Sequence, residues 1–184
     1  YQSLPLKFLL NFQPPIHSPR KARSRQIYSR MGLRFPRKTI GYQRVELAKL
    51  MGPQSRVSRR LYYREMKESK IVVSPFGWGE INNRDFESFI YGCLLVKPSV
   101  DHLITYPDFF LPNQTYLPYS WNFSDLEGLV ENLRSNFDNF FDIAINGQEK
   151  YINETISRNG REKFVQYFCE LLDGCLDEER VHKR

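Results

Sequence analysis

The segment from Ser74 to Glu87 carries the residues whose types and spacing could do chemistry. Its sequence is SPFGWGEINNRDFE, in which Gly77 and Gly79 precede two glutamates, Glu80 and Glu87. Backbone amides in a glycine loop that opens a helix bind anions, phosphates above all, and the positive end of the helix dipole adds to this. Carboxylates instead accept hydrogen bonds from hydroxyls. A site that combines both kinds of group suits a nucleotide-sugar.

The glycine loop matches no common nucleotide-binding signature. The chain has no G-x-x-x-x-G-K-[ST] sequence, and Gly77-Trp78-Gly79 supplies only half of the G-x-G-x-x-G pattern. By spacing alone, the loop is also consistent with a tight turn that links a strand to a helix. Glu87 is then an ordinary exposed helix residue. Trp78 either stacks on a base or sugar or caps the core.

The elements around the loop must place it at the end of a strand. The β-branched run at 71–74 predicts a strand, and the apolar face formed by Phe86, Phe89 and Ile90 predicts a helix from Asn83 to Tyr91. Other strands are expected over 6–11, 93–97 and 115–119. Other helices are expected over 21–31, 58–69, 124–134 (opened by a capping box at 124–127), 138–150 and 162–172, with a break at 159–160 and with 39–50 undecided.

The order strand, helix, strand, loop, strand, helices is typical of an α/β fold. We expect one Rossmann-like domain over 1–184, with a mostly parallel sheet flanked by helices and a helical C-terminus. Its parts are a basic segment (1–67), a ligand-binding core (68–135) and C-terminal helices (136–184). Ligands of such sheets bind outside the carboxyl ends of the strands. The loop at 14–20, which follows the first expected strand, should therefore lie at the same edge as the loop at 76–83.

Charge is spread unevenly along the 184 residues. Residues 20–67 contain fifteen Lys and Arg against two Glu, although the net charge of the whole chain is only +6. This asymmetry indicates an anionic ligand or partner. One alternative is a basic nucleic-acid-binding protein whose Tyr28, Tyr62 and Tyr63 stack on bases, although no RNP, KH or zinc-finger motif is present.

Composition excludes several other classes of protein. Three cysteines without metal-like spacing argue against a disulfide framework or a zinc site. The aromatic content of 15% argues against disorder. No apolar run approaches the roughly 20 residues of a membrane span. We therefore expect no transmembrane segment and a cytoplasmic location.

Three separated motifs carry a resemblance to a known family: SKIVVSPFGWGE, then RDFESFIYGCLLVKP, then HLITYPDFFLPNQTYLPYSWNFSDL. In this order they resemble the carboxyl-terminal, donor-binding half of GT-B-fold glycosyltransferases of the group-one type. The resemblance is strong from Ser69 to Leu133 and weaker to about Tyr167. It implies an enzyme of carbohydrate metabolism that transfers a sugar from a nucleotide-sugar donor to an acceptor, with no metal and no other cofactor.

The resemblance also implies roles for particular residues. Glu87 matches the helix glutamate that binds ribose. Glu80 is the nearest match to the loop glutamate that contacts the sugar, although the interval is seven positions here and eight in the family. The expected donor site comprises Gly77, Trp78, Gly79, Glu80, Ile81, Asn82, Asn83, Arg84 and Glu87, in which the amides of 81–83 and the side chain of Arg84 face the phosphates.

Basic residues after the first expected strand complete the expected site. By their position in the chain, we expect phosphate contacts from Arg20, Lys21 and Arg23. Alternatively, these residues form an exposed basic face of a helix. His17 and His102 either contact ligand or have structural roles, and no catalytic residue is assigned. The acceptor (a glycan, a protein or a small molecule) is expected to bind a domain outside this chain. A non-catalytic nucleotide-sugar or phosphate-binding module is the other alternative.

Overall fold

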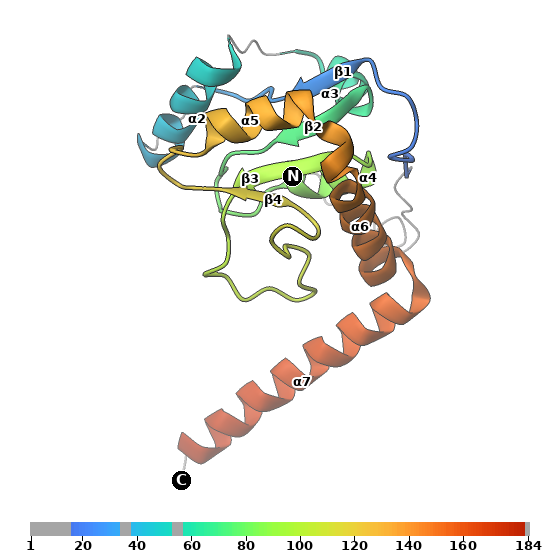
Figure 1. Ribbon diagram of the computed structural model, residues 1–184. Coiled ribbons are helices and arrows are strands. Elements are labelled where there is room, and N and C mark those ends of the chain that lie inside the picture. The colour runs from blue at the N-terminus through green and yellow to red at the C-terminus, as the bar shows by residue number, and fades with distance from the viewer. Residues whose placement is uncertain (1–15, 34–37, 53–56, 183–184) are drawn as a thin grey trace.

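The protein is built on a four-stranded, all-parallel sheet with helices on both faces (Figure 1). The structure, a computed structural model, describes residues 16–33, 38–52 and 57–182. The strands lie in the order β1-β2-β3-β4, and each pairs in parallel with its neighbour. They are β1 (Arg25–Tyr28), β2 (Ser69–Val73), β3 (Leu94–Pro98) and β4 (Leu117–Tyr119). The α/β fold with a parallel sheet is therefore confirmed.

Helices connect the first three strands, a loop connects β3 to β4, and helices form the carboxyl-terminal part of the chain. They are α2 (Lys38–Met51), α3 (Arg59–Lys67), α4 (Asn83–Ile90), α5 (Leu126–Ser135), α6 (Phe141–Tyr151) and α7 (Arg158–His182), with a 3₁₀ turn η1 (Phe137–Phe140) and a π-helical turn η2 (Ile152–Ile156). The expected helices at 58–69, 124–134 and 138–150 are present with shifted ends, and the undecided stretch at 39–50 is helical.

Side-chain alternation along the central strands divides the core into two layers. Ile71 and Val73 of β2 face α2 and α5, where they pack with Leu47 and other buried residues. Val72 points to the opposite face and packs with Met66 of α3. Residues from α4 and from the loops after β3 complete that second layer. Both faces of the central strands are buried, which explains their continuous apolar runs.

The predicted helix at 21–31 is wrong, because this stretch contains strand β1. Ile27 and Tyr28 are residues that favour strands, and they pair with Ile71 and Val72 of β2. Upstream of the strand, Ser18 begins a turn in which the Lys21 amide donates to the Ser18 carbonyl. The backbone hydrogen bonds of this stretch are thus made across the sheet. The strand expected at 6–11 lies outside the described residues.

Two helix starts differ from the sequence prediction. The capping box expected at 124–127 does not form, because the Asp125 carboxylate accepts hydrogen bonds from the amide and hydroxyl of Ser120, each at 2.8 Å. The break expected at 159–160 occurs earlier, at the extended residue Ser157, and α7 runs through Gly160. At the start of α7 the Ser157 hydroxyl accepts a hydrogen bond from the Gly160 amide at 2.9 Å, which caps the helix before the expected break.

Helix α7 extends away from the sheet domain (Figure 1). Its attachment includes Tyr106, whose ring stacks on Tyr167 with a centroid separation of 3.8 Å. The Tyr106 hydroxyl also donates to the Lys163 carbonyl at 3.4 Å. In the part of the chain that the structure describes, no helix is both long enough and apolar enough to cross a membrane.

Candidate functional site

A buried ion pair holds the glycine loop that follows β2. Lys97 Nζ lies 2.7 Å from Asp85 Oδ2, and both side chains are 0% exposed. Lys97 also donates to the Glu80 carbonyl at 2.9 Å, and the Ser74 hydroxyl donates to Asp85 at 2.6 Å. Burial lowers the pKa of Lys97, whereas the charge of Asp85 opposes this change. These contacts tie the loop to β3 and α4, so its shape is set by the protein before any ligand binds.

Asn82 caps the helix that starts after the loop. Its side-chain oxygen accepts a hydrogen bond from the Arg84 amide at 3.0 Å, and its own amide donates to Asp85 Oδ2 at 3.0 Å. This reciprocal capping box satisfies two of the orphan amides of the first turn. Three backbone amides were expected to face phosphate. That of Asn82 donates to Asp85, whereas those of Ile81 and Asn83 take no part in the capping box.

A buried arginine from α2 reaches the loop. Arg44 is 8% exposed, and its guanidinium donates to the Phe76 carbonyl at 3.3 Å and to the Gly32 carbonyl at 2.9 Å. Burial, together with the nearby charge of Arg84, lowers the pKa of Arg44 to about 10. Two guanidinium groups thus lie close to the glycine loop. Arg44 was not among the predicted site residues, although its position three residues before the core residue Leu47 marks the inner face of α2.

Glu87 lies on the side of α4 that faces α3. The hydroxyl of Tyr62 donates to Oε2 at 2.8 Å, and that of Tyr63 donates to Oε1 at 3.1 Å. The same Tyr62 hydroxyl lies 3.4 Å from Nε of Arg84, which donates to it. Arg84, Tyr62 and Glu87 therefore form one polar line from the start of α4 toward α3. A carboxylate has about four acceptor positions, so two tyrosine hydroxyls leave room for ligand hydroxyls.

Glu80 and His102 meet above the carboxyl end of β3. Their Oε2 and Nε2 atoms are 3.0 Å apart, with the side chains 34% and 45% exposed, respectively. The ring of His102 lies edge-to-face with Trp121 at 5.2 Å, and Trp121 donates to the Ser99 carbonyl at 2.8 Å. Trp78 is 67% exposed, so it does not cap the core. His102 was a candidate from the sequence, but its pairing with Glu80 was not predicted.

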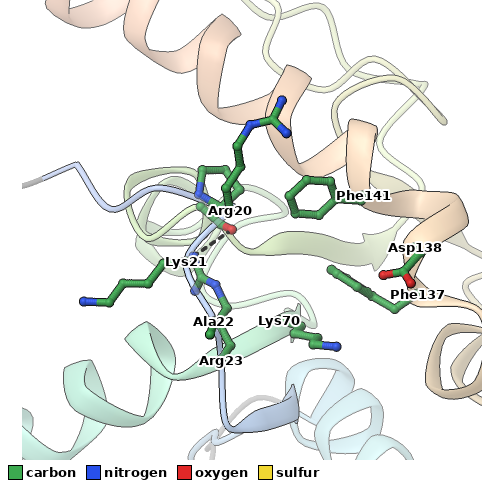
Figure 2. Close-up of a pocket in the computed structure, with 10 residues that line it drawn as sticks. Arg20, Lys21, Ala22, Arg23, Lys70, Phe137, Asp138 and Phe141 are labelled. Atoms are coloured by element: carbon green, nitrogen blue, oxygen red, sulfur yellow. Dashed lines mark hydrogen bonds between the residues drawn. The ribbon is translucent and has the colours of Figure 1, made fainter.

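The structure does not bring Arg20, Lys21 and Arg23 to this loop. They precede β1, whereas the loop follows β2. Because the two strands are parallel, these positions lie at opposite ends of the strands. With Lys70, Phe137 and Phe141, the three residues line a separate cavity of about 200 Å³ (Figure 2). The Arg23 guanidinium donates to the carbonyls of Ser69 and Tyr91 at 2.8 and 2.6 Å. These bonds give it a structural role in connecting three segments.

His17 also lies away from the glycine loop. Its ring stacks on Tyr91 at 4.9 Å, and its amide donates to the Ile90 carbonyl at the end of α4. Burial, followed by the charges of Lys67, Arg23 and Lys21, lowers its pKa. In the described ranges, no three His, Cys, Asp or Glu side chains gather as a metal-binding group.

Comparisons with known proteins add little to this geometry. No protein-family model matches the chain, and no curated protein matches it. One similar solved structure is the C-terminal domain of a glycosyl transferase group 1 family protein (LpcC) from Francisella tularensis. It shares 13% sequence identity with a TM-score of 0.42, and the match covers 78% of this chain and 89% of that chain. Similarity at this level carries no functional inference.

Proposed function

We propose that this chain is the donor-binding domain of a glycosyltransferase that uses a nucleotide-sugar. The observation that carries the proposal is that Arg44 contacts the glycine loop after β2, while Arg84 and Glu87 lie on the first two turns of the helix that the loop opens. Ligands of parallel α/β sheets bind at this edge. The motif resemblance from Ser69 to Leu133 points to the same chemistry.

Each part of the donor would meet a different group. The diphosphate would lie at the start of α4, near the amides of Ile81 and Asn83 and the guanidinium groups of Arg84 and Arg44. Guanidinium groups and helix amino termini both favour phosphate. The ribose hydroxyls would donate to Glu87, which lies one turn after Arg84. The transferred sugar would lie near Glu80.

Catalysis in this proposal consists of stabilising the departing nucleoside diphosphate. Negative charge grows on the leaving group as the bond to the sugar breaks, and groups already oriented toward it lower the barrier. The helix start and the arginines supply this stabilisation, so the proposal needs no metal ion. An acceptor-binding domain outside this chain would supply the acceptor and any general base.

A non-catalytic nucleotide-sugar or phosphate-binding module would use the same contacts. It differs from the enzyme only in the outcome after binding. Incubation of the protein with its best nucleotide-sugar, followed by chromatography for the free nucleoside diphosphate, separates the two. Hydrolysis or transfer that is faster than in a protein-free control supports the enzyme. Binding without turnover, also when the proposed acceptor-binding domain is supplied, supports the module.

The donor and the role of Glu87 are tested together. A thermal-shift panel of nucleoside diphosphates and nucleotide-sugars should identify the ligand, because a ligand that binds the native state stabilises it by mass action. For Glu87→Gln we expect calorimetry to show an affinity about 10- to 100-fold lower, as hydrogen bonds to charged groups contribute about 1.5–3 kcal/mol.

Glu131 of α5 provides the matched control, because it is exposed and far along the chain from the loop. The Glu131→Gln variant removes the same charge and should bind like the unchanged protein. Equal affinity of the Glu87 and Glu131 variants would contradict the ribose role. A panel with no stabilising nucleotide would contradict the proposed function itself.

A further inference from the structure

Three neighbouring strands of the sheet end beside the same group of side chains. Phe76 and Glu80 follow β2. His102 follows β3 and Trp121 follows β4, and these strands are adjacent in the sheet. The ring of Trp121 lies edge-to-face with Phe76 and with His102, each at a centroid separation of 5.2 Å. Trp121 therefore borders the glycine loop, although it lies far from it in the sequence.

Trp121 is held in place and yet remains about half exposed. Its indole N–H donates to the Ser99 carbonyl at 2.8 Å. The turn that carries it is closed by Asp125, whose carboxylate accepts hydrogen bonds from the amide and the hydroxyl of Ser120. Even so, Trp121 is 48% exposed, although tryptophan is highly buried on average. Because its hydrogen-bonding atom is already engaged, the ring offers a fixed apolar surface, and a ligand that packs on it meets a group already ordered.

The group beside the indole ring is suited to bind hydroxyls. Glu80 Oε2 lies 3.0 Å from His102 Nε2, and a carboxylate has about four acceptor positions, so Glu80 can accept further hydrogen bonds from a ligand. A pyranose sugar carries hydroxyls around its ring and C–H groups on its faces. Such C–H groups pack on the negative face of an aromatic ring. A fixed indole beside a hydroxyl acceptor is therefore complementary to a sugar ring.

The order of the strands distinguishes the sugar of the donor from its base. Glu87, the proposed ribose ligand, accepts hydrogen bonds from two tyrosines of α3. Helix α3 packs on β1 and β2, whereas Trp121 follows β4 at the other side of the sheet. The base and the sugar form opposite ends of a nucleotide-sugar. A donor whose ribose lies toward α3 would therefore direct its sugar toward β4.

We propose that Trp121 is a specificity-determining residue of the donor site, and that the pyranose ring of the transferred sugar stacks on its indole while sugar hydroxyls donate to Glu80. This inference rests on the proposed glycosyltransferase function and adds to it a contact that recognises the sugar and not the nucleotide. Removal of the indole should thus weaken binding of the nucleotide-sugar selectively.

Calorimetry with Trp121→Leu tests the stacking. The probes are hexose conjugates of UDP, GDP and ADP, each measured beside the free nucleoside diphosphate. For the conjugate that the unchanged protein binds, we expect an affinity about 10-fold lower, similar to the loss when an aromatic ring that stacks on a nucleobase is removed. The affinity for the nucleoside diphosphate should be unchanged, because that ligand lacks the sugar. Trp121→Phe keeps a flat ring and should retain most of the affinity for the conjugate.

Tryptophan fluorescence gives a second measurement, which does not depend on the folding of Trp121→Leu. In the unchanged protein, the conjugate should alter the emission more than the nucleoside diphosphate does, and Trp121→Phe should lose this difference. Phe168→Leu is the matched control, since it removes an exposed ring from α7, which extends away from the sheet domain (Figure 1). This variant should bind both ligands like the unchanged protein.

The outcomes separate this inference from the proposed function. Equal losses for the conjugate and the nucleoside diphosphate in Trp121→Leu would overturn the inference, because the ring would then stack on the base or hold Phe76. An unchanged affinity for the conjugate, or equal changes in emission with the two ligands, would overturn it as well. Failure of the unchanged protein to bind any nucleotide of the panel would contradict the proposed function and, with it, this inference.

Discussion

The two glutamates of the loop region have different surroundings, and this separates their expected roles. Glu87 accepts hydrogen bonds from Tyr62 and Tyr63, which hold both of its oxygens on the α3 side. Glu80 faces His102, on the side of β3 and Trp121. Arg84 lies at the start of α4, between the two glutamates in the sequence. The proposed donor site assigns the ribose to Glu87 and the transferred sugar to Glu80.

Glu80→Gln tests the sugar end of that assignment. We expect the affinity for the nucleotide-sugar to fall by about 10-fold, as for a lost hydrogen bond to a charged group. The affinity for the corresponding nucleoside diphosphate should stay the same, because that ligand lacks the sugar. Calorimetry with both ligands gives the comparison. Equal losses for both ligands would show that Glu80 acts on the loop and not on the sugar.

At the scale of elements, the first strand is joined to α3 through a carboxylate. Glu65 is almost fully buried and accepts two hydrogen bonds from the Arg30 guanidinium, one of them at 3.0 Å to Oε1. Arg25 of β1 lies 3.4 Å from the same carboxylate. Hydrogen bonding to Arg30 lowers the pKa of Glu65 below its ordinary value of 4.5. The pair positions the segment after β1, from which Gly32 contacts Arg44.

This lowered pKa makes the junction sensitive to acid. Because the folded value lies below the unfolded one, the carboxylate stabilises the fold fully above pH 4.5 and loses this contribution as the pH falls through the folded value. In urea unfolding at pH 7, Glu65→Gln should be less stable by about 1.5–3 kcal/mol. The difference should shrink below pH 4. A constant difference down to pH 3 would contradict the role of ionised Glu65.

At the scale of the whole molecule, several basic residues of the first third have partners within the fold. Arg23 binds backbone carbonyls, Arg30 binds Glu65, and Arg44 is buried beneath the glycine loop. In the nucleic-acid alternative, Tyr62 and Tyr63 stack on bases. Their hydroxyls instead donate hydrogen bonds to Glu87. Part of the positive charge therefore supports the fold and the proposed donor site, whereas other basic side chains, among them Arg59, Arg60 and Arg64, are exposed.

The hydrogen bonds that hold Tyr62 and Tyr63 on Glu87 predict weak binding to nucleic acid. We expect fluorescence anisotropy with a single-stranded oligonucleotide to show no saturable binding at about 200 mM salt, since non-specific contacts with phosphates weaken steeply as salt rises. Any binding at about 50 mM should be independent of base sequence. Saturable, base-dependent binding at the higher salt would favour the nucleic-acid alternative over the glycosyltransferase proposal.

The central segment could be predicted well because its signals are local. The β-branched residues of β2 and the apolar spacing of Phe86, Phe89 and Ile90 in α4 each act within a few positions. They specify the strand, the loop and α4 without reference to the rest of the chain. The candidate donor loop was therefore visible in the amino-acid order alone.

Long-range pairing decided the rest. The stretch 21–31 contains a strand because β2 offers it a parallel partner, and this moves Arg20, Lys21 and Arg23 to the edge opposite the loop. The contacts of Arg44 with Phe76, and of Glu80 with His102, join residues 32 and 22 positions apart. Such contacts depend on how strands and helices pack, and no spacing in the sequence encodes them directly. The chemistry of the loop is thus local, whereas the groups that surround it are assembled only by the sheet.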